Sequence, residues 1–365
     1  MDKNSRVKSI DALRGFDMLF IMGLSSLIIS VCKLWPDSGI AQWLSLQMTH
    51  APWHGLRHHD TIFPLFLFLA GMTFPFSLSA QREHGRSTAQ IVLKIVRRGL
   101  ALVLLGLVYE GLLQFDFANQ RVASVLGRIG LAWMFAALLY MSLKPRTTGC
   151  IAVLLLVGYW LLLWLVPGGG DPFSYEGNIV GVVDRKLLPG SLCYGDFDPE
   201  GILSTIPSVV TALLGMFTGE LVRIPAEKMS GGRKTLVMLG AAAVLIAVGC
   251  IWNKVFPINK NLWTSSFVCV VGGYSIALYA LFYWIIDVRG LSRWAFPLRV
   301  IGLNSITVYM AQSIIGFRGI EEFFLGGVLG LLPEAWSGIA GNLGYIVVVW
   351  LFLYFLYRKN VFLKV

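Results

Sequence analysis

Charged side chains are scarce in this sequence. Asp, Glu, Lys and Arg together make up 14% of the 365 residues, whereas a soluble globular domain carries about 25%. Apolar residues reach 56%, the mean hydropathy is +0.71, and long apolar runs such as 151–166 and 345–357 recur along the whole chain. A soluble core would not accommodate these runs. The composition therefore predicts an all-α protein that crosses a membrane many times.

The chain also lacks paired cysteines. Its five cysteines are scattered and form no CxxC motif, which excludes a disulfide framework and a zinc ribbon. No small-residue cleavage pattern follows the apolar stretch 16–31, so we expect an uncleaved first helix. The net charge of +10 is explained by basic residues that orient helices in a membrane, and we expect no nucleic-acid partner.

Ten segments are predicted to span the membrane: 16–34, 61–80, 95–113, 122–142, 149–166, 201–222, 235–252, 263–286, 298–315 and 336–357. The N-terminus and alternate loops hold 21 of the 30 Lys and Arg residues. This bias predicts a polytopic helix bundle of about ten transmembrane helices with both termini in the cytoplasm. No soluble stretch is long enough to fold alone, so we expect a single domain over 1–365.

Histidine is rare as well, but four of the five histidines fall within ten residues, at positions 50, 54, 58 and 59, and Asp60 follows directly. Three readings are open. A metal site is disfavoured, because a proline and a glycine interrupt the helical spacing. Solvated loop imidazoles are favoured for His58 and His59. In the third reading, one histidine is a general base or acyl carrier, and Asp60 or a backbone carbonyl fixes its tautomer.

Other polar groups lie where spans begin. Asp198 and Glu200 directly precede a span, where capping alone explains them, although they face the same side as the histidines. The segment 257–263 combines two amides, an ammonium and an indole, which suit either a sugar or an interfacial anchor. Within or beside spans lie Asp11, Arg14, Asp17, Glu110 and Arg128. We expect Asp11 to pair with Arg14, and Arg128 to find a carboxylate partner in Glu110 or Asp17.

These motifs, in this order, resemble the membrane-bound heparan-α-glucosaminide N-acetyltransferases and their bacterial relatives. The resemblance covers nearly the whole chain. It rests on Ser9-Ile-Asp-Ala-Leu-Arg-Gly15, His50-Ala-Pro-Trp-His-Gly55, Asp60-Thr-Ile-Phe-Pro64, Arg121-Val-Ala-Ser-Val-Leu-Gly-Arg128, Asp198-Pro-Glu-Gly-Ile-Leu203, Pro257-Ile-Asn-Lys-Asn-Leu-Trp263 and Gly302-Leu-Asn-Ser-Ile306. The animal enzymes of that family carry asparagine where this chain has Ser25 and His54.

The resemblance implies an acetyl-CoA-dependent transferase that acetylates an amino sugar, such as a terminal glucosamine or an oligosaccharide, on the outer side of the membrane. It implies that His50 is the catalytic histidine, and we expect Asp60 to support it. We expect no metal, and Arg14 and Arg128 to bind the donor. The expected acceptor site consists of Trp53, His54, Asp198, Glu200, Asn259, Lys260, Asn261, Trp263 and Asn304.

Two other functions compete with this one. A proton-coupled transporter of sugars or peptidoglycan fragments would relay protons through Asp17, Glu110 and His50. A non-catalytic partner of a cell-envelope machine is the third. The expected location is the cytoplasmic (inner) membrane of a bacterium, in contact with lipid. Transfer to oxygen instead of nitrogen, an acetyl-histidine intermediate and a homodimer are left open.

Overall fold

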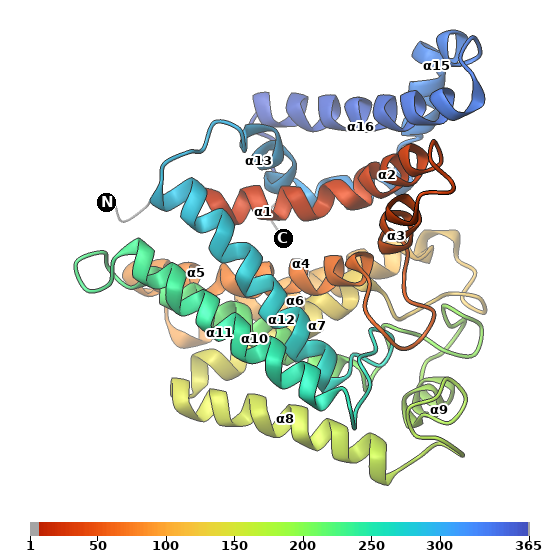
Figure 1. Cartoon of the computed structure of the whole chain (residues 1–365). Helices are drawn as coiled ribbons and strands as arrows, with labels where there is room; N and C mark the ends of the chain where they lie inside the picture. The colour runs from red at the N-terminus through yellow and green to blue at the C-terminus, as the bar shows by residue number, and fades with distance from the viewer. Residues whose placement is uncertain (1–6, 364–365) are drawn as a thin grey trace. The chain divides into compact units, whose positions relative to one another are not determined.

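The computed structural model describes residues 7–363, and every regular element in that range is a helix (Figure 1). This confirms the all-α prediction. Lys3, Arg6 and Lys364, which entered the charge count, lie outside the described residues. Eight helical segments of the described range are long and apolar enough to cross a membrane: Lys8–Cys32, His58–Glu83, Val125–Ser142, Pro145–Leu165, Ile202–Arg223, Gly231–Trp252, Ser265–Val288 and Glu334–Arg358.

The two remaining predicted spans differ from expectation for local reasons. The segment 95–113 falls largely within α6 (Thr88–Tyr109), which is long enough to cross but carries Lys94, Arg97 and Arg98 in its first half. The segment 298–315 is broken into α13 (Phe296–Leu303) and α14 (Ser305–Ile314), because Asn304 leaves helical geometry at φ −125°. The apolar stretch 323–333 is helical only as far as the end of α15 (Phe317–Leu329).

The chain forms two compact units. Within the described residues, the first comprises 7–51, 57–62 and 279–363, and the second comprises 52–56 and 63–278. The chain passes between them at four points, so neither unit is one contiguous stretch ended by a linker. The histidine-rich segment is divided in this way: positions 50, 58 and 59 belong to the first unit and position 54 to the second.

In the first unit, α1 (Lys8–Leu19), η1 (Phe20–Leu24) and α2 (Ser25–Cys32) follow one another as a single kinked helix. The kink contains a π turn in which Gly23 adopts φ 124°, a conformation that a side chain would strain. Helix α1 packs against α13 with backbone in contact with backbone, since a Cβ on Gly15 would meet the Leu298 carbonyl. Helix α16 (Glu334–Arg358) packs against α2, η1, α13 and α15. The short helix α3 (Gly39–Gln47) leads to the histidine segment.

The second unit is organised around α10 (Thr205–Arg223), which packs against α5 (Phe74–Glu83), α7 (Val125–Ser142), α8 (Pro145–Leu165) and α11 (Gly231–Trp252). Gly215 and Gly219 face α4 (Ile62–Met72): a Cβ on either would meet the carbonyl of Phe68 or Met72. The GxxxG step therefore serves close helix packing, as its spacing indicates. Helices α9 (Ile179–Leu187) and α12 (Ser265–Tyr283) complete this unit as far as residue 278.

Candidate functional site

His50 and Asp60 form a hydrogen-bonded pair in the first unit. His50 Nδ1 lies 2.7 Å from Asp60 Oδ1. The other carboxylate oxygen accepts from the backbone N–H groups of Ala51, at 3.2 Å, and Arg57, at 3.0 Å. Asp60 is held in the turn η2 (His58–Thr61) that opens the second apolar span. The ten-residue loop thus returns on itself and places the carboxylate against the imidazole.

The two side chains differ in accessibility, and this difference defines the chemistry of the pair. Asp60 is 1% exposed, whereas the His50 side chain is 46% exposed. An ionised carboxylate only accepts hydrogen bonds, so Nδ1 of His50 carries the hydrogen and Nε2 is the unprotonated ring nitrogen. The Arg57 guanidinium donates to Thr49 Oγ1 at 2.8 Å and to the His50 carbonyl at 2.7 Å, which fixes the backbone of His50. An accessible imidazole oriented by a buried carboxylate is suited to take a proton from a substrate.

The interpretation of His58 and His59 as merely solvated side chains is wrong. Both are partly buried. The His58 ring packs 4.5 Å from the ring of Phe20. His59 Nδ1 lies 3.3 Å from Ser25 Oγ, and its ring centroid lies 4.5 Å from that of His50. Packing between the loop and the first helix, which the local sequence does not reveal, accounts for both positions.

In the second unit, Asp198 and Glu200 meet on one arginine. Arg121 donates to both oxygens of Asp198, at 2.8 Å each, to Glu200 at 2.5 Å and to Glu110 at 3.1 Å. Asp198 is fully buried and also accepts from the Cys193 N–H. Sequence reasoning placed Asp198 and Glu200 at a helix start but missed Arg121 as their partner, although it lies in a quoted motif on the same predicted side.

Trp53 and His54 lie in the same unit, and a second loop holds them. The indole N–H of Trp53 donates to the Phe173 carbonyl at 2.8 Å. The Gly55 N–H donates to the Ile258 carbonyl at 2.8 Å, and His54 Nδ1 lies 3.4 Å from Asn259 Nδ2. Partial burial lowers the pKa of His54, and the nearby Asp171 carboxylate, which acts to raise it, has the smaller effect. The neutral form of the His54 imidazole is therefore favoured. The segments 52–56 and 257–263 are therefore joined by direct bonds.

Three of the four predicted sugar ligands in 257–263 are buried. The Asn259 side-chain oxygen accepts from the Leu262 N–H at 2.9 Å, and Asn261 is 7% exposed. Trp263 is fully buried, packs edge-on against Phe63 and donates to Thr211 Oγ1 at 3.2 Å. Because the ring is buried, Trp263 is better placed to position the loop than to stack on a sugar. Lys260 is the partly exposed member of the set.

Arg128 is a buried cation in α7. Its side chain is 2% exposed and lies 5.0 Å over the ring of Trp263. Nη2 donates to Ser204 Oγ and to the Gly201 carbonyl, whereas Nε and Nη1 have no acceptor among the described residues. The expected carboxylate partner, Glu110 or Asp17, is wrong, because Arg128 bonds Ser204 and Gly201 instead, and Glu110 bonds Arg121. Two buried nitrogens of one guanidinium are thus available to a ligand or an ordered water.

The remaining two predicted site residues belong to the first unit. Arg14 pairs with Asp11 at 3.7 Å, which confirms the expected i,i+3 pair. Asn304 occupies the break between α13 and α14, where its amide donates to the Val361 carbonyl at 3.2 Å and its oxygen accepts from Thr307. Both side chains are therefore engaged within their own unit. No group of three or more side chains that could hold a metal ion occurs in residues 7–363.

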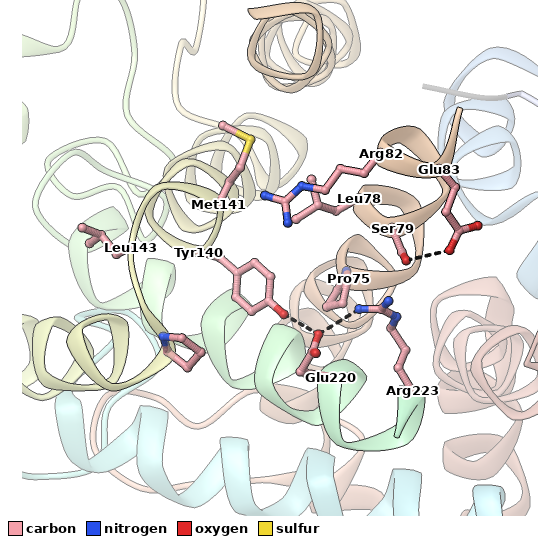
Figure 2. Close-up of a pocket in the computed structure, with 11 residues that line it drawn as sticks. Pro75, Leu78, Ser79, Arg82, Glu83, Tyr140, Met141, Leu143, Glu220 and Arg223 are labelled. Atoms are coloured by element: carbon pink, nitrogen blue, oxygen red, sulfur yellow. Dashed lines mark hydrogen bonds and ion pairs between the residues drawn. The ribbon is translucent and has the colours of Figure 1, made fainter. Parts of the chain in front are cut away.

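A pocket of about 320 Å³ lies between the ends of α5, α7 and α10 (Figure 2). Tyr140 and Arg223 both donate to Glu220 Oε2, at 2.6 and 3.0 Å. Arg82 and Glu83 add one charge of each sign to the lining. Two carboxylates and two guanidinium groups thus line the pocket, and their formal charges cancel.

Comparison with known proteins agrees with the resemblance noted from the motifs. The family described as "Heparan-alpha-glucosaminide N-acetyltransferase, catalytic" matches residues 6–249. The human protein named heparan-alpha-glucosaminide N-acetyltransferase is 26% identical over 99% of this chain, and the mouse protein of that name is 25% identical over 99%. The chain spans 60% of the human protein's length and 61% of the mouse protein's.

Proposed function

Since the chain belongs to the heparan-α-glucosaminide N-acetyltransferase family by a match that covers most of its length, we propose that this multi-pass membrane protein transfers the acetyl group of acetyl-CoA to the amine of a glucosamine-like sugar. The hydrogen bond of 2.7 Å between His50 and the buried Asp60 carries the proposal. This bond orients His50 as the base that amine acetylation needs, and His50 lies in a segment that matches the family's histidine motif.

The proposed chemistry starts from a donor that is already activated. A thioester needs no further activation, so the protein has to remove a proton from the attacking amine and to stabilise the negative charge on the carbonyl oxygen. His50 Nε2 takes the proton, and Asp60 stabilises the imidazolium that forms. Direct transfer uses His50 as a base only, whereas a carrier mechanism would place the acetyl group on the same nitrogen.

We propose that donor and acceptor approach from opposite sides of the membrane. The bias of Lys and Arg supports an orientation with both termini in the cytoplasm and the segment 49–60 outside. The acyl end of the donor then has to reach the outer half of the bundle. The two unbonded nitrogens of Arg128, Nε and Nη1, support its proposed role in holding a carbonyl of the donor arm, and Arg14 lies near the predicted cytoplasmic end of α1.

The proposed acceptor site combines accessible groups with buried groups that position them. Trp53, His54 and Lys260 are not buried and would meet the sugar. Asp198 and Glu200 bring excess negative charge that suits an ammonium group, because Arg121 balances only one of the carboxylates that it bonds. The buried members Asn259, Asn261 and Trp263 would act by holding the loop 257–263 in place, whereas Asn304 would act within the first unit by bonding the Val361 carbonyl. A bacterial cytoplasmic membrane, a lipid contact, a homodimer and transfer to oxygen stay predictions.

The test is acetyl transfer by the purified protein. Labelled acetyl-CoA is supplied with and without glucosamine, and wild type is compared with His50→Ala and with His84→Ala. His84 is an exposed histidine whose ring contacts the Ala80 carbonyl, so its variant controls for loss of an imidazole.

We expect N-acetylglucosamine from wild type and His84→Ala, and a loss of ~10²–10⁴-fold in His50→Ala. Label that stays on wild-type protein when glucosamine is omitted would identify the carrier mechanism. Uptake of sugar into vesicles without any acetylation would instead support the transporter, for which the break between α13 and α14 is the structural argument.

A further inference from the structure

We propose that His59 is a second acid–base residue of the acetyl transfer, which protonates the departing thiolate while His50 deprotonates the amine. This inference rests on the proposed function. It comes from one juxtaposition: a second partly buried imidazole lies with its ring centroid 4.5 Å from that of His50, and Ser25 Oγ holds it at Nδ1. Asp60, 1% exposed, bonds Nδ1 of His50 and is the carboxylate of the group.

The position of His59 is built by elements far apart in the chain. Ser25 opens α2 and is 7% exposed, and it lies 34 residues before the histidine that it bonds. His59 itself lies in η2, the turn that also carries Asp60. Contacts from two elements restrict the rotation of the His59 ring. A ring held in one orientation is positioned to transfer a proton to a substrate bound beside His50. A surface histidine without a role needs no such support.

The other polar groups around His50 do not suit the second proton transfer. Arg57 is engaged with Thr49 and the His50 carbonyl, and a guanidinium does not give up its proton in proteins. Asp60, ionised, only accepts. The Nδ1 atom of His58 is buried, and its ring packs against Phe20. His59 is the remaining imidazole beside His50, and an imidazolium can give a proton from a ring nitrogen.

The step balances as follows. The amine nitrogen forms a bond to the acetyl carbon, and His50 Nε2 takes the proton that the nitrogen loses. The carbon–sulfur bond breaks, and the sulfur takes the proton of the His59 imidazolium, so the products are the acetamide and the free thiol of CoA. His50 ends protonated and His59 neutral. A proton passing from His50 to His59 restores the starting state.

The charge of the group stays constant during this cycle. The histidine pair carries one proton beyond neutrality before and after the transfer, and the single negative charge of Asp60 balances it in both states. Protonating both rings at once would place two positive charges at a centroid separation of 4.5 Å, which is unfavourable. One proton on the pair is the state in which the proposed step begins and ends.

The test compares variants of His59 by steady-state kinetics with acetyl-CoA and glucosamine. His59→Asn keeps a polar group that can bond Ser25 but cannot supply a proton, and His59→Ala leaves space for added imidazole. His84→Ala is the control. We expect kcat to fall about 10²-fold in both His59 variants, at the lower end for acid–base catalysis, because a thiolate is already a fair leaving group. KM for both substrates should change by less than a few-fold.

Rescue of His59→Ala by a series of substituted imidazoles separates catalysis from structure. If His59 is an acid, the more acidic imidazolium ions should rescue better at equal concentration of the protonated form, and His84→Ala should not respond. Wild-type rates in His59→Asn and His59→Ala would overturn the proposal, as would rescue that is independent of the pKa of the added imidazole. An inactive wild-type protein would instead remove the proposed function itself.

Discussion

Replacing Asp60 by Asn tests the catalytic pair with almost no change in shape. Asp60 uses its two oxygens differently: Oδ1 accepts from His50, and Oδ2 accepts from the backbone N–H groups of Ala51 and Arg57. An asparagine keeps both backbone bonds only if its single oxygen takes the place of Oδ2. Its amide NH₂ then faces His50 Nδ1 and donates to it.

This orientation reverses the tautomer of His50. With Nδ1 acting as acceptor, the hydrogen resides on Nε2, and the imidazole cannot take a proton from the amine. The carboxylate that stabilises the imidazolium is lost at the same time. We therefore expect kcat to fall by the full contribution of a general base, ~10²–10⁴-fold. The hydrogen bonds to His50, Ala51 and Arg57 are all kept, so the free energy of unfolding should change by only about 1–2 kcal/mol.

The assay measures kcat and KM for acetyl-CoA together with thermal unfolding. Asp37→Asn, a change at an exposed carboxylate in the loop before α3, serves as the control. The double variant Asp60→Asn/His50→Ala should be no slower than His50→Ala alone, because the two residues act as one unit. Asp60→Asn at wild-type rate, with His50 still required, would show that Asp60 does not set the tautomer of His50.

Three further predictions concern the second unit. Arg121→Ala should destabilise the protein by about 3–5 kcal/mol, measured by chemical denaturation, because it leaves the buried Asp198 carboxylate without its partner; an unchanged midpoint would contradict this. Burial raises the pKa of Asp184 from 3.8 to about 6, so the folded state holds this proton more tightly than the unfolded state does. The free energy of unfolding should therefore rise as pH falls through about 6, by at most about 3 kcal/mol. Asp184→Asn should lack this rise. Gly215→Val should lower the unfolding temperature strongly, since its side chain would meet the Phe68 carbonyl, and wild-type behaviour would argue against close packing of α4 and α10.

The sequence predicts well the features that depend on neighbouring residues. Apolar runs identify eight spans because length and hydropathy alone decide them. The pairing of Asp11 with Arg14 follows from helical spacing, and the proximity of His50 and Asp60 from a short loop. The two departures among the spans also have local causes: basic residues in α6, and Asn304 at the break between α13 and α14.

The features that were missed depend on contacts between distant segments. Arg121 lies 77 residues before Asp198, and nothing in either motif identifies the other as its partner. The burial of His59 against Ser25 likewise depends on how a loop packs on a helix. Trp263 shows the ambiguity of one side chain: an indole suits a membrane interface, a sugar or a core, and only tertiary packing reveals that it is fully buried.

We propose that the protein acetylates a sugar on the side of the membrane opposite to the donor and that His50 is required for the transfer. Sealed vesicles with the cytoplasmic face outward, loaded with glucosamine and given labelled acetyl-CoA outside, test it directly. Wild type should accumulate N-acetylglucosamine inside the vesicles. In His50→Ala the rate of accumulation should be ~10²–10⁴-fold lower. Product formed only when donor and sugar share one compartment, or an undiminished rate in His50→Ala, would contradict the account.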